Sequence, residues 1–263
     1  MTDTTFKKRK DFSFTMYDDI VDLHTHTIAC GHAYNTLYEM AQAAAAKKLA
    51  LFGSSEHAPA APGSCTESYF RNYKVIPRRL FGVPTLLGAE LNIMDYEGRV
   101  DLPDSVLARV DYCIASLHIN CLESGSIREN TEACVKALKN PYVAILGHPD
   151  DGRYPLDYEC LVSHAKQYHK LLEVNNSSLS PVSFRQGARE HYKEMLKLCR
   201  RYKQPVILSS DAHIASDVGN HDLAKELLAE LDFPPELVVN SSLENLAVYL
   251  PKISEYGFGR TAQ

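Results

Sequence analysis

The sequence lacks three features that would each place it in a special class of protein. Its seven cysteines form no Cys-X-X-Cys pair, and an odd number does not close a disulfide framework, so we expect reduced thiols and a cytoplasmic protein. No apolar run approaches the length that spans a membrane. The net charge of −5 argues against a general nucleic-acid binder and leaves only a local basic groove open.

The length and the termini predict one domain. A chain of 263 residues suffices for a single large α/β domain. Residues 1–18 are polar, carry the basic cluster 7–10 and lack the apolar core of a secretory signal, so we predict a flexible N-terminal tail. We place the domain at 19–250, because no linker or low-complexity segment interrupts it, and a C-terminal tail at 251–263.

Short apolar runs alternate with helical or irregular stretches along the chain. We predict seven strands, at 20–23, 50–54, 85–89, 112–116, 143–147, 171–174 and 206–209. We predict helices at 37–48, within 67–81, and at 128–138, 158–168, 186–202, 223–231 and 243–249. Thr36 and Glu39 have the spacing of a capping box at the start of the first helix. The alternation of strands and helices predicts a parallel sheet in an α/β domain.

Metal-binding residue types follow the ends of the predicted strands. In the first strand, Asp22, His24 and His26 alternate and therefore share one face. Because the carboxyl ends of parallel strands gather at one face, we expect nine residues to meet there. They are His24, His26, His32, His57, Glu90, His118, His148, Asp211 and His213. The other histidines lie in or beside predicted helices, and we exclude them from the site: His164, His169, His191 and His221.

The donor types in this set indicate a transition-metal centre. Imidazoles with a few carboxylates and no thiolate suit Zn²⁺, Mn²⁺ or Fe²⁺ rather than Ca²⁺ or Mg²⁺. Nine ligands are too many for one ion, so two or three ions are needed. Glu90 stands alone on a central strand and is the best candidate to bridge them. Clustered ions of this kind activate water and stabilise the charge of a phosphoryl transition state.

Several motifs in order carry a family resemblance. They are Asp-X-His-X-His at 22–26, His-Ala-Tyr at 32–34, Glu-His-Ala-Pro at 56–59, a lone Glu90, Leu-His at 117–118, Gly-His-Pro at 147–149 and Ser-Asp-Ala-His at 210–213. This series resembles the PHP (polymerase and histidinol phosphatase) superfamily over nearly the whole chain. Glu-Val-Asn-Asn-Ser-Ser at 173–178 and Phe-Pro-Pro-Glu at 233–236 are most similar to its bacterial YcdX-type phosphatase branch.

The resemblance implies a fold and a set of metal ligands. The fold would be a distorted, TIM-like (β/α)7 barrel with three divalent ions, usually zinc, with Mn²⁺ or Fe²⁺ as alternatives. By resemblance, the first ion would be held by His24, His26, Glu90 and Asp211. The second would be held by Glu90, His118 and His148, and the third by His32, His57 and His213. Glu90, Asp211 and His213 are also the residues that we assign to catalysis.

Two residues depart from the pattern of the branch. Glu56 stands where Asp is common, and we expect it to orient His57 or its neighbours. Asp150 stands where Gly is more usual. Its carboxylate would either repel an anionic substrate or point to solvent. Both departures leave the expected ligands intact and therefore bear on the substrate more than on the metal.

These observations predict a metal-dependent phosphatase that acts on a small phosphate monoester. Arg185, after the sixth strand, is our first choice to bind the phosphate and Arg153 the second, with a solvated surface arginine as the alternative for each. A nuclease or proofreading exonuclease and a non-catalytic metal-binding regulatory domain are the other two hypotheses. We expect neither a nucleic acid nor a membrane as partner, and the natural substrate, the general acid and the oligomeric state stay open.

Overall fold

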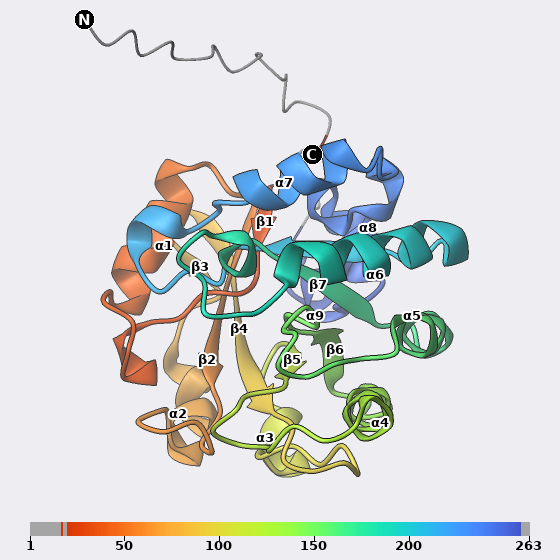
Figure 1. The fold of residues 1–263 in the computed structure, drawn as a ribbon. Coiled ribbons are helices and arrows are strands. Elements are labelled where there is room, and N and C mark those ends of the chain that lie inside the picture. The colour runs from red at the N-terminus through yellow and green to blue at the C-terminus, as the bar shows by residue number, and fades with distance from the viewer. Residues whose placement is uncertain (1–16, 18–19, 259–263) are drawn as a thin grey trace, which may run out of the picture.

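The computed structural model describes Tyr17 and residues 20–258 of the chain, and its centre is a curved parallel sheet (Figure 1). The parallel strands follow the order β1-β2-β4-β5-β6-β7-β8. Their bounds are β1 Val21–Asp22, β2 Leu51–His57, β4 Val83–Asn92, β5 Cys113–Ser116, β6 Val143–Leu146, β7 Leu171–Asn175 and β8 Val206–Ser209. A short β3 (Arg79–Leu80) pairs antiparallel with β4. The expected seven-stranded, TIM-like α/β fold is confirmed, and β3 is a two-residue addition that we did not predict.

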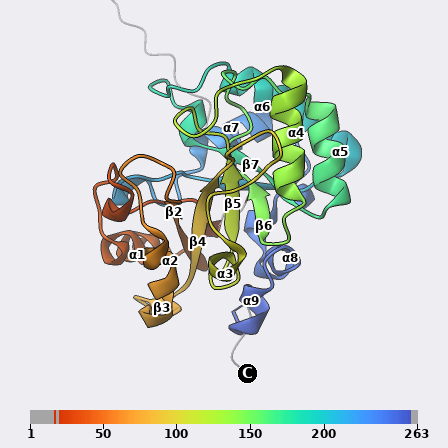
Figure 2. The same cartoon turned by 90° about the horizontal axis from the view of Figure 1, so that it is seen from below.

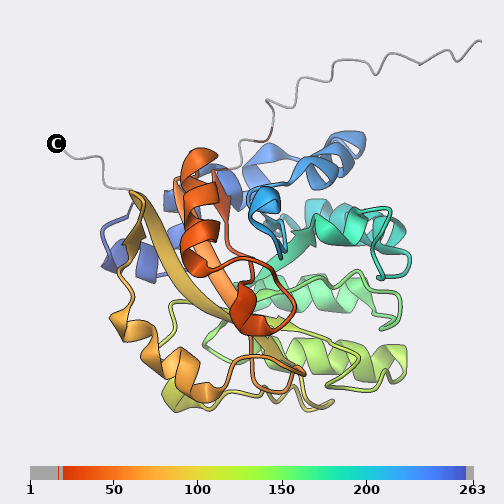
Figure 3. The same cartoon turned by 90° about the vertical axis from the view of Figure 1, so that its left-hand side faces the viewer.

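Helices cover the outside of the sheet, and α8 and α9 cover the interior at the amino ends of its strands. Their bounds are α1 Leu37–Ala46, α2 Glu67–Arg71, α3 Asp104–Leu107, α4 Ile127–Leu138, α5 Tyr158–Gln167, α6 Ala188–Tyr202, α7 Asp222–Glu230, α8 Leu243–Ala247 and α9 Lys252–Glu255. Helices α4 and α5 lie side by side outside β5, β6 and β7 (Figure 2), and α1 lies against β2 (Figure 3). The capping box is confirmed, since Thr36 N–H donates to Glu39 Oε2 at 2.7 Å. Within the described part of the chain, no helix has both the length and the apolarity needed to cross a membrane.

The segments predicted as tails include residues that pack against the domain. Residues 1–16, 18–19 and 259–263 lie outside the described residues, but Tyr17 is buried and its hydroxyl donates to Phe233 O at 2.6 Å. The predicted tail at 251–263 begins with α9, whose Ile253 joins an interior apolar cluster with Leu250. These apolar side chains cover the interior at the amino ends of the strands.

Alternate residues along β4 show how the interior is divided. Leu86 belongs to the apolar cluster that α8 and α9 cover. Two residues on, Gly88 faces the ring of Tyr112, where an added Cβ would lie 2.5 Å from Cζ. Two residues further, Glu90 is buried among histidines. Because side chains two residues apart on a strand point to the same face, this face of β4 is apolar near the amino end and polar near the carboxyl end.

The register between β2 and β4 places two expected ligands side by side. Both strands extend beyond their predicted ends, β2 to His57 and β4 to Asn92. In the ladder between them His57 is the partner of Glu90. The extension therefore puts both residues on rigid strand backbone rather than on loops.

The seam between the first and last strands is closed in two places. Toward the carboxyl ends, Thr25 and Ala212 form an isolated parallel bridge. Toward the amino ends, β1 and β8 are not neighbours in the ladder order, and the side chain of Asn240 in the 3₁₀ turn η7 (Val239–Ser241) connects them by hydrogen bonds. Its Nδ2 donates to Val21 O at 2.9 Å and to Leu208 O at 2.8 Å, and its Oδ1 accepts from Leu208 N–H at 2.7 Å.

We expect Asn240→Ala to destabilise the fold. The side chain is fully buried, so the change leaves three backbone groups of β1 and β8 without partners. Because one unsatisfied buried group costs about 1–3 kcal/mol, the free energy of unfolding should fall by roughly 3 kcal/mol or more. Urea denaturation measures the change. Asn245→Ala, at an exposed position five residues on, is the control, and equal stabilities of the two variants would contradict the role of Asn240.

Candidate metal centre

The carboxylate of Glu90 lies at the middle of five imidazole rings. Its Oε2 is 2.7 Å from His57 Nδ1, 3.3 Å from His24 Nε2 and 3.4 Å from His26 Nε2. Its Oε1 is 2.9 Å from His148 Nε2 and 3.3 Å from His118 Nε2. The side chain is 1% exposed. One carboxylate in contact with five imidazoles from four segments is the arrangement expected of a bridging ligand.

Asp211 and two more histidines complete the cluster. Asp211 Oδ1 lies 3.3 Å from His26 Nε2 and 3.6 Å from His24 Nε2. The Nε2 atoms of His32 and His213 are 3.0 Å apart, and the ring of His32 stacks on that of His57. The structure thus brings all nine expected ligands into one continuous cluster at the carboxyl ends of the strands.

Several buried atoms of the cluster have no hydrogen-bond partner. They are His24 Nε2, both ring nitrogens of His26, His57 Nδ1 and Glu90 Oε2. Buried polar atoms are normally paired, because an unpaired one carries a desolvation cost. Nitrogen lone pairs and carboxylate oxygens that converge in this way fit divalent cations. Groups of three ligand atoms within 4.8 Å of one another are His24, His26 and Glu90, and His32, His57 and His213.

The far side of the rings is held by acceptors. His24 Nδ1–H donates to Glu173 Oε1 at 2.6 Å, and His118 Nδ1–H donates to Asn92 Oδ1 at 2.7 Å. The Nδ1 atoms of His32 and His213 face backbone carbonyls of Cys30 and Asp211. Such partners place the proton on Nδ1 and leave the Nε2 lone pair for a metal.

Charge balance keeps the two central carboxylates ionised. Burial alone would raise the pKa of Glu90, but the neighbouring His57, His24 and His118 hold it well below its usual range. Burial opposes ionisation of Asp211 as well, yet His24, His26 and Arg185 hold its pKa well below the ordinary value. Both carboxylates are therefore negatively charged at neutral pH and can bind cations.

Two expected ligands have strained backbones. His148 has φ 28° and Asp211 has φ 54°, in the left-handed region that residues other than glycine rarely adopt. Such strain persists only where surrounding contacts hold it, and it concentrates at functional sites. One holding contact is the bond from His148 N–H to Glu173 Oε2 at 2.6 Å.

Asp22, Glu56 and Asp150 are all buried. Asp22 accepts from Ser210 Oγ at 2.5 Å and from Gly219 N–H at 2.7 Å, so it ties the first strand to the loop that carries Asp211. Glu56 accepts from Thr27 N–H at 3.1 Å and holds the backbone next to His26. Asp150 is fully buried and accepts from Ser178 Oγ at 3.2 Å. The expectation that the Asp150 carboxylate points to solvent is therefore wrong.

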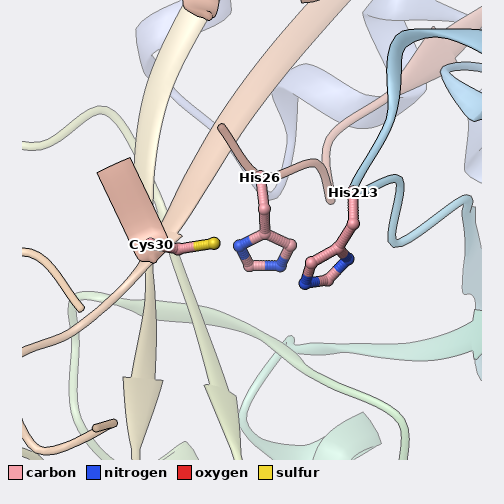
Figure 4. Close-up of side chains that lie close together, drawn as sticks. All are labelled: His26, Cys30 and His213. Carbon is pink, nitrogen blue, oxygen red and sulfur yellow. The ribbon is translucent and has the colours of Figure 1, made fainter. Parts of the chain in front are cut away.

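We assigned no site role to Glu173, Asn92 or Cys30 from the sequence. Glu173 and Asn92 lie on strands with the parity of the site, a signal that was present in the sequence. Cys30 gave no such signal, since it is a single cysteine in a loop. The turn η2 (Ile28–Cys30) directs its sulfur toward the ring of His26, with His213 on the other side (Figure 4). Ligand atoms of His26, Cys30 and His213 lie within 4.8 Å of one another. Burial raises the pKa of the Cys30 thiol.

The two arginines that we selected differ in position. Arg185 is 8% exposed, and its guanidinium lies 3.1 Å from Asp211 Oδ2 and 2.9 Å from Ser178 Oγ. Arg153 is 23% exposed and pairs with Asp151, with Nε 2.9 Å from Oδ2. Both line the same pocket above the histidines. Arg185 therefore touches the cluster itself, and Arg153 lies at its rim.

Comparison with known proteins gives one family and a consistent set of relatives. The family model described as the PHP domain matches residues 22–231. A protein of Caldicellulosiruptor bescii named probable phosphatase is 44% identical over 230 residues, which cover 88% of this chain and 95% of that protein. A probable phosphatase of Clostridium novyi is 42% identical over 231 residues, 88% of this chain and 94% of its own.

Two solved structures share the fold at low sequence identity. A histidinol phosphate phosphatase from Lactococcus lactis, solved with zinc, L-histidinol and phosphate, has a TM-score of 0.56 at 17% identity, over 81% of this chain and 94% of that one. A chain of an archaeal ribonuclease P bound to mature tRNA has a TM-score of 0.57 at 17% identity, over 92% and 97%. At this identity, the likeness establishes the fold alone.

We expect Glu173→Gln to weaken metal binding. The carboxylate accepts from His24 Nδ1–H, His148 N–H and Asn175 Nδ2–H, and an amide would turn a donor toward one of them. Loss of such a partner typically reduces metal affinity about 10–100-fold. Titration with Zn²⁺ against a competing chelator measures the affinity. Glu190→Gln, at an exposed position on α6, is the control, and an unchanged affinity in Glu173→Gln would refute this role.

Proposed function

The chain belongs to the PHP domain family, and from this membership we propose that it is a metal-dependent phosphatase that hydrolyses a small phosphate monoester at a trinuclear centre. The observation that carries the proposal is the set of buried imidazole nitrogens around Glu90 that have no hydrogen-bond partner. Relatives named probable phosphatase and the fold shared with a histidinol phosphate phosphatase support the reaction type.

The proposed ligands divide into three sets. His24, His26, Glu90 and Asp211 would hold one ion, and Glu90, His118 and His148 a second. The third would lie among His32, His57 and His213, whose ligand atoms lie within 4.8 Å of one another. The contacts add one feature, because His57 Nδ1 is 2.7 Å from Glu90 Oε2 and so connects the third set to the carboxylate that the first two sets share. Imidazole and carboxylate donors favour Zn²⁺, with Mn²⁺ and Fe²⁺ as alternatives.

The protein's own groups define where the phosphate binds. Divalent cations at these ligands would lower the pKa of bound water and neutralise charge on the phosphoryl oxygens. Arg185 is the cation that we assign to the phosphate, since its guanidinium already lies beside Asp211. Burial opposes its charge, but Asp211 and Asp150 raise its pKa above the ordinary value, so it stays protonated. Glu90, Asp211 and His213 are the proposed catalytic residues, as ligands next to the reacting phosphate.

Asp150 lies next to Arg185, the arginine that we assign to the phosphate. Its carboxylate and the guanidinium of Arg185 both contact Ser178 Oγ, at 3.2 and 2.9 Å. Burial raises the pKa of Asp150, and the nearby guanidinium of Arg185 opposes that rise. We propose that Asp150 positions this arginine rather than repelling the substrate.

We expect His24→Ala/His26→Ala to abolish phosphatase activity. With Zn²⁺ and p-nitrophenyl phosphate, kcat/KM should fall by more than about 100-fold, because the cation that activates water loses two ligands. His164→Ala, which removes a histidine of α5 outside the cluster, should keep full activity. Full activity in the double variant would remove the proposed site. Stoichiometric metal without hydrolysis of any ester would instead favour a non-catalytic domain.

We expect removal of metal to lower the melting temperature. A ligand that binds only the folded state at 100 times its Kd stabilises that state by about 2.7 kcal/mol. For a chain of this size, each kcal/mol corresponds to roughly 2–4 °C, so chelation should lower Tm by about 5–10 °C. Differential scanning calorimetry before and after dialysis against a chelator tests this, and added Zn²⁺ should restore Tm. An unchanged Tm would contradict tight binding of metal in the fold.

A further inference from the structure

A pocket of about 630 Å³ opens directly above the proposed metal ligands. Its floor includes His57, His118, His148 and Asp211. Its walls come from the segments that follow β2, β5, β6 and β7, among them Ala61, Pro62, Ile119, Asn120, Arg153 and Phe184. A phosphate at the floor would point its ester oxygen, and the group attached to it, toward these walls.

Two large apolar side chains of the walls are exposed. Ile119 is 56% exposed and Phe184 is 70% exposed. The ring of Phe184 is held by two guanidinium groups, with Arg153 Cζ 4.9 Å and Arg185 Cζ 5.4 Å from its centroid. Such contacts stabilise a fixed ring position. Exposed apolar side chains at the mouth of a pocket with a polar floor are typical of a site for an apolar ligand group.

The charged groups of the walls are already paired. Arg153 makes a two-oxygen contact with Asp151, with Nε 3.0 and 2.9 Å from the carboxylate oxygens. Arg185 pairs with Asp211 at the floor and is the cation already assigned to the phosphate itself. Among the described lining residues, these pairs account for every aspartate and arginine. The walls therefore offer neither an unpaired carboxylate for a substrate ammonium group nor an unpaired cation for a second phosphate or a carboxylate.

We propose that the substrate is the phosphate monoester of a neutral apolar alcohol, aromatic or aralkyl, whose carbon skeleton packs against Ile119 and Phe184. This inference rests on the proposed phosphatase function and names the substrate class of that site. In the reaction, the oxygen of water forms a bond to phosphorus and the bond to the ester oxygen breaks. The alcohol leaves with a proton, and inorganic phosphate is the second product.

A pair of esters with similar leaving groups tests the proposal. Benzyl phosphate and glycerol 1-phosphate both release a primary alcohol, so their intrinsic reactivity is close. A difference in kcat/KM between them therefore reports contacts with the pocket. With the zinc-loaded enzyme, kcat/KM should be at least about tenfold higher for benzyl phosphate, because a phenyl ring leaves water. Phe184→Ala and Ile119→Ala should each reduce this preference severalfold. Val182→Ala, in the same loop as Phe184 but 91% exposed and outside the pocket, should leave it unchanged.

Binding of inert analogues separates this inference from the proposed function. Calorimetry should show tighter binding of benzylphosphonate than of methylphosphonate, and Phe184→Ala and Ile119→Ala should remove the difference. If both esters are hydrolysed equally well and the phosphonates bind alike, the apolar substrate class is wrong and the phosphatase function stands. If neither ester is hydrolysed but the preference for benzylphosphonate remains, the phosphatase function fails and the apolar pocket stands. A loss of both preferences in Phe184→Ala but not in Ile119→Ala would overturn the role of Ile119.

Discussion

The buried carboxylate of Glu90 and its ring of imidazoles is the interaction on which the site depends. Each of its oxygens contacts at least two histidines, and those histidines come from β2 and from segments that follow β1, β5 and β6. Such a group is costly to bury unless charge compensates it. The histidines and the cations for which they are suited provide that compensation, so metal binding and the packing of the strand ends are coupled.

The seam of the barrel determines whether the cluster is complete. The segment after β1 carries His24 and His26, and the segment after β8 carries Asp211 and His213, so these ligands meet only if the two strands lie together. The bridge from Thr25 to Ala212, the bonds of Asn240 and the carboxylate of Asp22 all join these two strands. The structure therefore uses side-chain hydrogen bonds where the regular ladder is short, and a buried amide far from the ligands supports the site.

The pocket combines a polar floor with walls that include exposed apolar side chains. Below, Glu173 holds the ring of His24 and the backbone of His148, and Asp150 raises the pKa of Arg185. Above, Ile119 and Phe184 expose carbon to the opening. The residues that we propose for the reaction and those that we propose for substrate choice are therefore different.

From the sequence alone, the seven strands could be located along the chain and the residues at their carboxyl ends could be selected, because strands have short apolar runs and parallel strands present their carboxyl ends at one face. His24, His57 and Glu90 could be selected on that ground alone. The folded structure sets the directions of side chains and their contacts with residues distant in the chain. It turned Asp150 inward to Ser178, paired Arg153 with Asp151 and brought Cys30 against His26. It also extended β2 and β4 and packed α9 under the barrel, since register and burial arise only when separate segments meet.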